Sequence, residues 1–556
     1  MSEQIRQLLP LKANRRGIDR WSMGALIIAV LVVLPIAAVV WFALTPTDNI
    51  WPHLISTTFP RYIRNTVILM LSVGALTAVV GTITAWVVAM YRFPGRSWLQ
   101  WALLMPLAVP AYVGAYALVD FLEYAGPVQS ALRDMMGWEN AADYAFPAIR
   151  TRSSAVIVLS ASLYPYVYLL ARAAFREQSG AGFEVARALG VGPFGRFFRV
   201  GLPLARPAIA AGVAVVMMET VNDFGTVDYF AVQTLTTGIF TVWLQGGNLG
   251  GAAQLATCVL GMIVFLVTLE KLSRRRSKFF ASARGQRPVS LTQLSGGQGV
   301  FAFLVCLLPI LIGFVLPVSV LTSHALDAGQ WVAPGLRKAL LHTVTVAGLA
   351  AILTVLGGLF LVYGVRLSQR KLPRLLMPVT AIGYAAPGAV LGLGILVPLA
   401  ALDNRFADAV LALTGRDPGL LVTGTAGVLV IAYVVRFFAI AQGTADAAFG
   451  RVSPSLPMAA RSLGQSSGGV LKRIYLPLMR ASVGSALLLV FVDAVKELPA
   501  TLLLRPFSYD TLATRVHAKA SLENISEAAP AALMITCVGL LAVIFLAKAQ
   551  KEGLRR

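Results

Sequence analysis

The chain has 556 residues, of which 57% are hydrophobic and 13% charged, and its mean hydropathy is +0.74. An average soluble domain has roughly 25% charged residues, so this composition excludes a soluble globular protein. The formal net charge of +22 suggests nucleic acid, but no aromatic and basic face exists outside the apolar runs, so we expect no nucleic-acid partner.

Apolar runs long enough to cross a bilayer recur along the whole chain. A bilayer core of about 30 Å needs about 20 apolar residues in a helix. Alternating strand patterns are absent, so the fold class is predicted to be an all-α polytopic membrane protein with about twelve transmembrane helices in contact with the lipid bilayer. The expected spans are about 21–44, 66–90, 98–120, 153–174, 204–224, 251–270, 300–322, 342–365, 375–400, 420–440, 479–498 and 529–548.

Basic residues cluster at alternate ends of the predicted spans. Arg15, Arg16 and Arg20 precede the first span, and further clusters follow the sixth and the eighth spans, at 271–278 and 366–374. By the positive-inside rule, this distribution predicts that both the N- and the C-terminus are cytoplasmic. The first span is long and no small-residue cleavage site follows it, so we expect a retained helix and not a signal peptide.

The chain also repeats itself. The stretch EVARALGVGPFGRFFRVGLPLARPAI from Glu184 returns as MAARSLGQSSGGVLKRIYLPLMRASV from Met458, at an offset of 274 residues. At an offset of 277, Asn65-Thr66 matches His342-Thr343, Pro110 matches Pro387, and TLTT from Thr234 matches TLAT from Thr511. We therefore expect two tandem six-helix repeats, inserted in the same sense and related by an axis along the membrane normal.

The repeats divide the chain into five segments. These are a cytoplasmic N-terminal segment (1–20), a first transmembrane domain (21–273), a cytoplasmic linker (274–299), a second transmembrane domain (300–548) and a cytoplasmic tail (549–556).

Between the fourth and fifth spans of each repeat lies a loop that predicts a short helix ending at a glycine. Residues 184–189 favour helix, Gly190 can supply a left-handed C-cap, and Pro203 opens the next helix. The second loop keeps the same distance of thirteen residues between Gly464 and Pro477. A connector that only rests on lipid headgroups would not need this distance in both copies.

The pattern Glu-x-Ala-x-x-x-Gly followed by Leu-Pro resembles the EAA loop of permeases in binding-protein-dependent ABC importers, where the loop forms a coupling helix in a cleft of the partner ATPase. The resemblance implies two fused MetI-like permease repeats in the bacterial inner membrane, with ABC ATPase subunits (two copies) and a periplasmic substrate-binding protein as partners. The ATPase-coupling residues that it implies are Glu184, Ala186, Gly190 and Pro203, then Met458, Ala460, Gly464 and Pro477. Because Met458 stands where the acidic residue belongs, the second docking contact is expected to be weaker or purely apolar.

Polar residues on the fifth helix of each repeat predict a transport pathway. Glu219, Asn222 and Asp223 are spaced i, i+3, i+4 and share one helical face. At the repeat offset, Asp493, Lys496 and Glu497 have the same spacing. Ionisable groups at membrane depth are costly and normally face a cavity or a partner. A pseudo-two-fold axis would gather these six side chains around a central pathway. In the alternative, Lys496 forms a structural bridge with Glu219 or Asp493.

The string LSGGQ at Leu294–Gln298 is the signature of ABC ATPases, yet we expect it to be a coincidence in the linker. An ATPase needs a phosphate-binding loop of the form GxxxxGK[ST], and this chain contains no Gly-Lys dipeptide. The string also abuts the span from Val300, which leaves no room for an α/β domain. We therefore expect no enzyme activity, no catalytic residue and no cofactor bound by this chain, with ATP hydrolysed by partner subunits.

Four acids and one base in the predicted pathway favour a cationic cargo. The segments ETVNDFGTVDYFAVQTLTTGIFTVW and KELPATLLLRPFSYDTLATRV resemble the ferric-iron subgroup of fused permeases, which implies delivery of iron(III) by a periplasmic protein. Hard Fe³⁺ prefers oxygen ligands, but no metal site can be derived from the sequence. The alternatives within the family are permeases for thiamine, polyamine or phosphonate. Outside the family, the alternatives are a secondary cation transporter and a cation channel.

Overall fold

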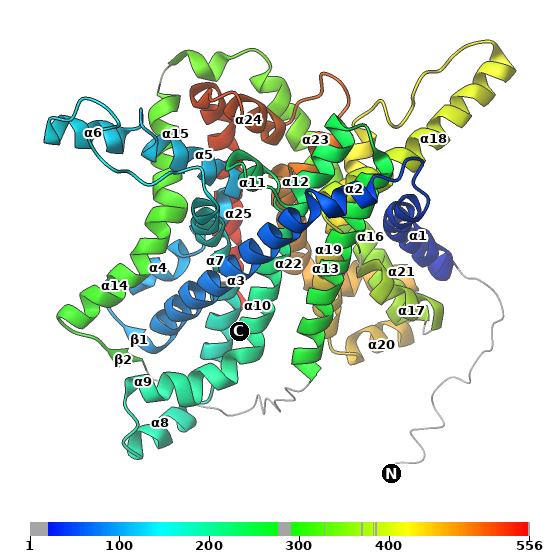
Figure 1. Cartoon of the computed structure of the whole chain (residues 1–556). Helices are drawn as coiled ribbons and strands as arrows, with labels where there is room; N and C mark the ends of the chain where they lie inside the picture. Colours follow the sequence, from blue (N-terminus) through cyan, green and yellow to red (C-terminus); the bar gives the residue numbers. More distant parts are fainter. Residues whose placement is uncertain are drawn as a thin grey trace.

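The computed structural model of the chain describes residues 20–275, 291–326, 328–368, 371–381, 383 and 386–553 (Figure 1). The predicted all-α membrane fold is confirmed, because the only strands among these residues are two of two residues each. Ten of the described helices are long and apolar enough to cross a membrane, or as many as 12 when each of two bent pairs is counted as one span. Residues 1–19 and most of the predicted linker lie outside the described residues.

The first half runs from α1 to α13, with 3-10 or π turns labelled η. Its elements are α1 Arg20–Leu44, α2 Trp51–Ser56, α3 Phe59–Met90, β1 Tyr91–Arg92, α4 Arg96–Ala102, η1 Met105–Ala108, α5 Ala111–Leu122, α6 Pro127–Met136, α7 Arg152–Arg176, α8 Gly180–Ala188, α9 Pro193–Arg196, η2 Phe197–Gly201, α10 Leu202–Asn222, α11 Gly225–Tyr229, α12 Leu235–Phe240, η3 Thr241–Gln245 and α13 Leu249–Arg275.

The second half begins at the short strand β2. Its elements are β2 Thr292–Gln293, α14 Gly297–Ile310, η4 Leu311–Val315, α15 Leu316–Ala325, η5 Ala328–Val332, α16 Leu336–Ser368, α17 Lys371–Thr380, α18 Gly388–Thr414, α19 Gly427–Arg451, α20 Ser455–Ser462, α21 Ser467–Val470, η7 Leu471–Tyr475, α22 Leu476–Val495, α23 Pro499–Leu504, α24 Leu512–Ala520 and α25 Ile525–Gly553.

The sequence repeat corresponds to a repeat of hydrogen bonds. Thr234 and Thr511, which open the matched TLTT and TLAT strings, are the N-caps of α12 and α24, and each forms a capping box with the threonine three residues later. The Leu235 N–H donates to the Thr66 hydroxyl at 3.0 Å, and the Leu512 N–H donates to the Thr343 hydroxyl at 2.8 Å. The residues that recur at this offset therefore join the same two helices in each half.

Two predicted spans are wrong in detail, because proline interrupts them. The expected span 98–120 is bent by 92° between Arg96–Ala108 and Ala111–Met136. Val109 precedes Pro110 and is extended (φ −95°, ψ 119°), the conformation that proline favours in the residue before it. The expected span 375–400 is likewise divided: α17 ends at Thr380, and α18 starts after Pro387 and continues to Thr414.

The first helix of each half packs against the other half. Helix α1 packs against α16, α17 and α18, and the ring of Trp21 lies 4.8 Å from that of Phe360. In the opposite direction, α14 contacts α3 and α4, and α15 contacts α5. Figure 1 shows α1 beside α17 and α16 on one flank, and α14 beside α4 on the other. The two repeats therefore form one intertwined body with shared hydrophobic cores.

Candidate functional site

The two predicted coupling loops have the expected local structure. Helix α8 ends before Gly190 and α20 ends before Gly464, and both glycines have left-handed φ angles, 76° and 80°. In each loop the backbone N–H of the residue after the glycine donates a hydrogen bond to the carbonyl of the buried alanine. The Val191 N–H donates to Ala186 at 2.9 Å, and the Gln465 N–H donates to Ala460 at 3.0 Å. This bond is the outer bond of a Schellman cap, so the glycine prediction is confirmed in both copies.

Pro203 and Pro477 are the second residues of α10 and α22, as predicted, but helical backbone already precedes them in each half. The first-half helix runs from Pro193 to Asn222, and the turn at Phe197–Gly201 just before Pro203 is π-helical. The second half has the same π turn at Leu471–Tyr475, before Pro477. Proline lacks the N–H of a regular helical bond, and a wider turn is one way to accommodate it.

Both loops lie at the same end of the molecule, at the bottom of Figure 1, with α8 and α20 on opposite flanks. Glu184 is exposed on α8, and Met458, its counterpart on α20, is 66% exposed. The two loops therefore present a carboxylate and a thioether at equivalent points on the same face of the protein.

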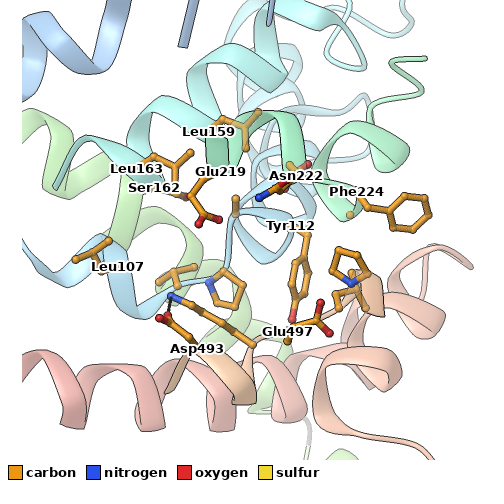
Figure 2. Close-up of a pocket in the computed structure, with 18 of the residues that line it drawn as sticks. Leu107, Tyr112, Leu159, Ser162, Leu163, Glu219, Asn222, Phe224, Asp493 and Glu497 are labelled. Atoms are coloured by element: carbon orange, nitrogen blue, oxygen red, sulfur yellow. Dashed lines mark ion pairs between the residues drawn. The ribbon is translucent and has the colours of Figure 1, made fainter. Parts of the chain in front are cut away.

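The six residues of the predicted pathway come together in one cavity of about 310 Å³ between the halves (Figure 2). Figure 2 shows Glu219 and Asn222 on one wall, and Asp493 and Glu497 on the opposite wall. The cavity is lined by Leu107, Val109, Pro110, Ala111, Tyr112, Leu159, Ser162, Leu163, Tyr166, Glu219, Asn222, Asp223, Phe224, Gly225, Arg436, Phe437, Ile440, Leu489, Asp493, Lys496, Glu497, Leu498 and Pro499. The ends of α10 and α22 therefore converge as the repeat symmetry requires. The predicted single helical face is wrong, because α10 ends at Asn222 and α22 at Val495, so that Asp223, Lys496 and Glu497 follow the helices.

Two of the four carboxylates cap short helices. Asp223 accepts the N–H groups of Thr226 (3.1 Å) and Val227 (3.0 Å) at the start of α11. Glu497 accepts those of Ala500 (2.9 Å) and Thr501 (3.0 Å) at the start of α23. A carboxylate at this position satisfies donors that would otherwise lack a partner and faces the positive end of the helix dipole. Asp223 and Glu497 therefore both line the cavity and hold its wall.

The second half of the cavity contains two ion pairs. The Lys496 ammonium lies 2.9 Å from Asp493, which confirms the pairing of the structural-bridge alternative, and the dashed line in Figure 2 ends on Asp493. The Arg436 guanidinium lies 2.8 Å from Glu497, whose side chain is only 1% exposed. A carboxylate this deeply buried needs a partner, and Arg436 supplies it from the neighbouring helix α19.

Gly388, the first residue of α18, allows this pair to form. A Cβ there would come within 2.7 Å of Glu497 Oε1 and within 3.0 Å of the Ala500 nitrogen, both below normal contact. The helix can start beside the ion pair only because this residue has no side chain.

Sequence reasoning missed four polar residues of the cavity: Tyr112, Ser162, Tyr166 and Arg436. Signals in the sequence pointed to two of them. Tyr112 follows the repeated Pro110, and Arg436 is a charged residue inside a predicted span, where a functional or paired role is expected. Among the described residues, no group of three or more His, Cys, Asp and Glu side chains could hold a metal ion.

Residues 77–278 match the family model of the binding-protein-dependent transport system inner membrane component. The chain is 25% identical over 493 residues to the Fe(3+)-transport system permease protein FbpB 2 of Haemophilus influenzae, which covers 87% of this chain and 89% of that protein. It is 23% identical over 429 residues to the ferric transport system permease protein FbpB of Actinobacillus pleuropneumoniae, covering 72% of this chain and 58% of that protein.

Other relatives match only part of the chain. The sulfate transport system permease protein CysT of Escherichia coli is 23% identical over 248 residues, which is 44% of this chain and 86% of that protein. Similarity over most of the chain therefore occurs with the ferric permeases, and the sulfate permease aligns with less than half of it.

Proposed function

We propose that this chain, which is an ABC importer permease of the binding-protein-dependent type, moves iron(III) from a periplasmic binding protein into the cytoplasm. The two halves alternate access to the central cavity, and two copies of a separate ATPase subunit drive the cycle from the cytoplasmic side. Both chain termini lie on that side, as the distribution of basic residues predicts.

The observation that carries the proposal is the acid excess of the central cavity. Its walls contain four carboxylates, one lysine and one arginine. Both cations are engaged by carboxylates, at 2.8 and 2.9 Å, so the cavity offers a passing ion more negative than positive charge. Such a cavity favours a cation and opposes an anion such as sulfate or a phosphonate.

The coupling loops favour an ATP-driven importer over a secondary cation transporter or a channel. Two capped helices, α8 and α20, stand at equivalent positions and expose side chains on one face of the molecule. Neither of those two classes needs such a pair. In this proposal each helix, with its glycine cap, docks into one ATPase subunit and transmits its movement to α10 or α22.

Transport by the purified complex tests this function. The chain, its ATPase and the periplasmic binding protein are reconstituted in proteoliposomes, and uptake of iron(III), thiamine, a polyamine and sulfate is compared. We expect saturable iron(III) uptake that requires ATP and is insensitive to ionophores. Uptake of another cargo in place of iron(III) would contradict the assignment of the substrate, and ATP-independent uptake abolished by an ionophore would support a secondary transporter.

A further inference from the structure

The excess negative charge of the central cavity lies on one of its two walls. Its second-half wall carries Asp493 and Glu497 together with Lys496 and Arg436, which form the two ion pairs, so this wall is neutral overall. The described lining residues of the first half include two carboxylates, Glu219 and Asp223, and no lysine or arginine. The acid excess of the cavity therefore belongs to the first-half wall.

Two differences between the repeats produce this asymmetry. At the repeat offset, Lys496 corresponds to Asn222 and Arg436 corresponds to Ser162. All four side chains line the cavity, so each cation of the second half stands at a position whose equivalent in the first half is a neutral polar residue. The asymmetry is therefore a property of the wall itself, produced by residue type at positions that the fold makes equivalent.

The first-half wall also holds two buried polar groups without a hydrogen-bond partner. Asn222 Oδ1 and the Tyr112 hydroxyl are inaccessible and unpaired, on side chains that are 8% and 5% exposed. Figure 2 shows Tyr112 extending from α5 toward Glu497, with Asn222 above it on the same side of the cavity. Buried polar groups are almost always paired, so each unpaired group needs an explanation such as a ligand that is not bound in this state.

The Asn222 amide can present its oxygen to the cavity without losing a hydrogen bond. Neither end of the amide has a partner among the described residues, and a half-turn about the last side-chain bond exchanges oxygen and nitrogen. The Tyr112 hydroxyl hydrogen has no acceptor among the described residues, so it can turn aside and leave the oxygen lone pairs available to a cation. Amide and phenol oxygens are the kind of hard donor that hard cations prefer.

We propose that the first-half wall is the face that contacts the cargo cation, with the Asn222 amide oxygen and the Tyr112 phenol oxygen as direct ligands. Glu219 and Asp223 supply the excess negative charge, and the two ion pairs of the second half hold the opposite wall. This inference rests on the proposed import of a cation, and it assigns the ligands that the carboxylates alone do not provide.

Single substitutions in the reconstituted complex test the assignment. Tyr112→Phe and Asn222→Leu remove the ligand oxygens and keep the approximate shape, whereas Asn222→Asp keeps an oxygen at the same place. Tyr433→Phe is the matched control, because Tyr433 is a buried tyrosine of the second half that does not line the cavity and whose hydroxyl bonds Thr501 at 2.6 Å. Initial rates of ATP-dependent iron(III) uptake and thermal unfolding midpoints are measured on the same preparations.

We expect uptake to fall at least about tenfold in Tyr112→Phe and Asn222→Leu, and to stay within about threefold of the parent in Asn222→Asp and Tyr433→Phe. Thermal stability should follow the opposite order for the two tyrosines. Tyr433→Phe loses a hydrogen bond and melts lower, whereas Tyr112→Phe removes an unpaired hydroxyl and melts no lower.

Three outcomes would overturn the assignment. Parental uptake in both Tyr112→Phe and Asn222→Leu would show that these oxygens do not contact the cargo. An equal loss in Tyr433→Phe, or a loss that follows the lowered melting point, would show a structural effect. A parental complex that does not import iron(III) would overturn the proposed function, and this inference with it. Iron(III) uptake that is insensitive to these substitutions would overturn the ligand assignment alone.

Discussion

The buried pair between Arg436 and Glu497 gives the most quantitative prediction. Arg436→Met keeps an unbranched apolar side chain close to the length of the arginine stem and removes the guanidinium, leaving a carboxylate that is 1% exposed without its cation. Removing one partner of a buried ion pair typically costs about 3–5 kcal/mol. Glu497 still accepts the N–H groups of Ala500 and Thr501 and the Thr501 hydroxyl, so we expect the lower end of this range, about 3 kcal/mol.

The double variant Arg436→Met with Glu497→Gln separates charge from capping. The glutamine carbonyl can still accept from the start of α23, and no buried charge remains. Because only the charge-assisted part of the bonds is lost, we expect a cost of about 1 kcal/mol, hence about 2 kcal/mol of recovery. The measurement is reversible unfolding of the purified chain in mixed detergent, with Arg436→Lys as the charge-retaining control.

Two results would refute this reasoning. If Arg436→Met unfolds at the parental detergent concentration, the ion pair does not stabilise the protein. If the double variant is no more stable than the single one, the cost comes from lost packing of the arginine side chain and not from an unpaired carboxylate.

The remaining predictions concern coupling and charge. Gly190→Ala should weaken association with the ATPase, whereas Gly182→Ala on the same loop should not. Neither new Cβ meets another atom within 4 Å, but only Gly190 has a left-handed φ, in which a side chain costs about 1 kcal/mol. Equal binding by both variants would contradict the docking role. Glu184→Ala should lower ATPase association more than Met458→Ala, since only the first removes a charge, and a pull-down with equal losses would count against the asymmetry. Ser295→Ala combined with Gln298→Ala should leave ATP-driven uptake unchanged, because both side chains are exposed, one just before α14 and one in its first turn. The chain alone should show no ATPase activity, and lost uptake at normal expression would mean that this segment matters. Glu219→Gln should reduce iron(III) uptake about tenfold, equivalent to about 1.4 kcal/mol, with assembly intact, and undiminished uptake would remove this carboxylate from the pathway.

Local patterns of the sequence predicted the features that depend on nearby residues. Gly190 and Gly464 were identifiable as caps because a left-handed residue after a short helix favours glycine, and the structure shows positive φ at both. The i, i+3, i+4 spacing predicted one helical face for Glu219, Asn222 and Asp223, and all three line the cavity. The shared face is wrong for Asp223, because α10 ends at Asn222 and Asp223 has an extended backbone. The proline-broken spans were missed, because hydropathy reports apolar length and not backbone direction.

The partners of the charged groups could not be derived in the same way. Arg436 and Glu497 are 61 residues apart, and their ion pair depends on how α19 and α23 are rotated toward each other. The sequence left Lys496 with two possible partners, and the structure pairs it with Asp493. The capping role of Asp223 and Glu497 depends on short helices, α11 and α23, that are too brief to show a periodic pattern.

The sequence by itself thus determined the membrane class, the two repeats, the glycine caps and the six polar residues, because each follows from periodicity or from a constant offset along the chain. Only the tertiary structure decided that α1 packs on the second half and α15 on the first, and that the acid excess faces the cavity from one wall. Both depend on contacts between segments far apart in the chain. Electrostatic energy depends on the distance between charges in space, which no spacing along the sequence specifies.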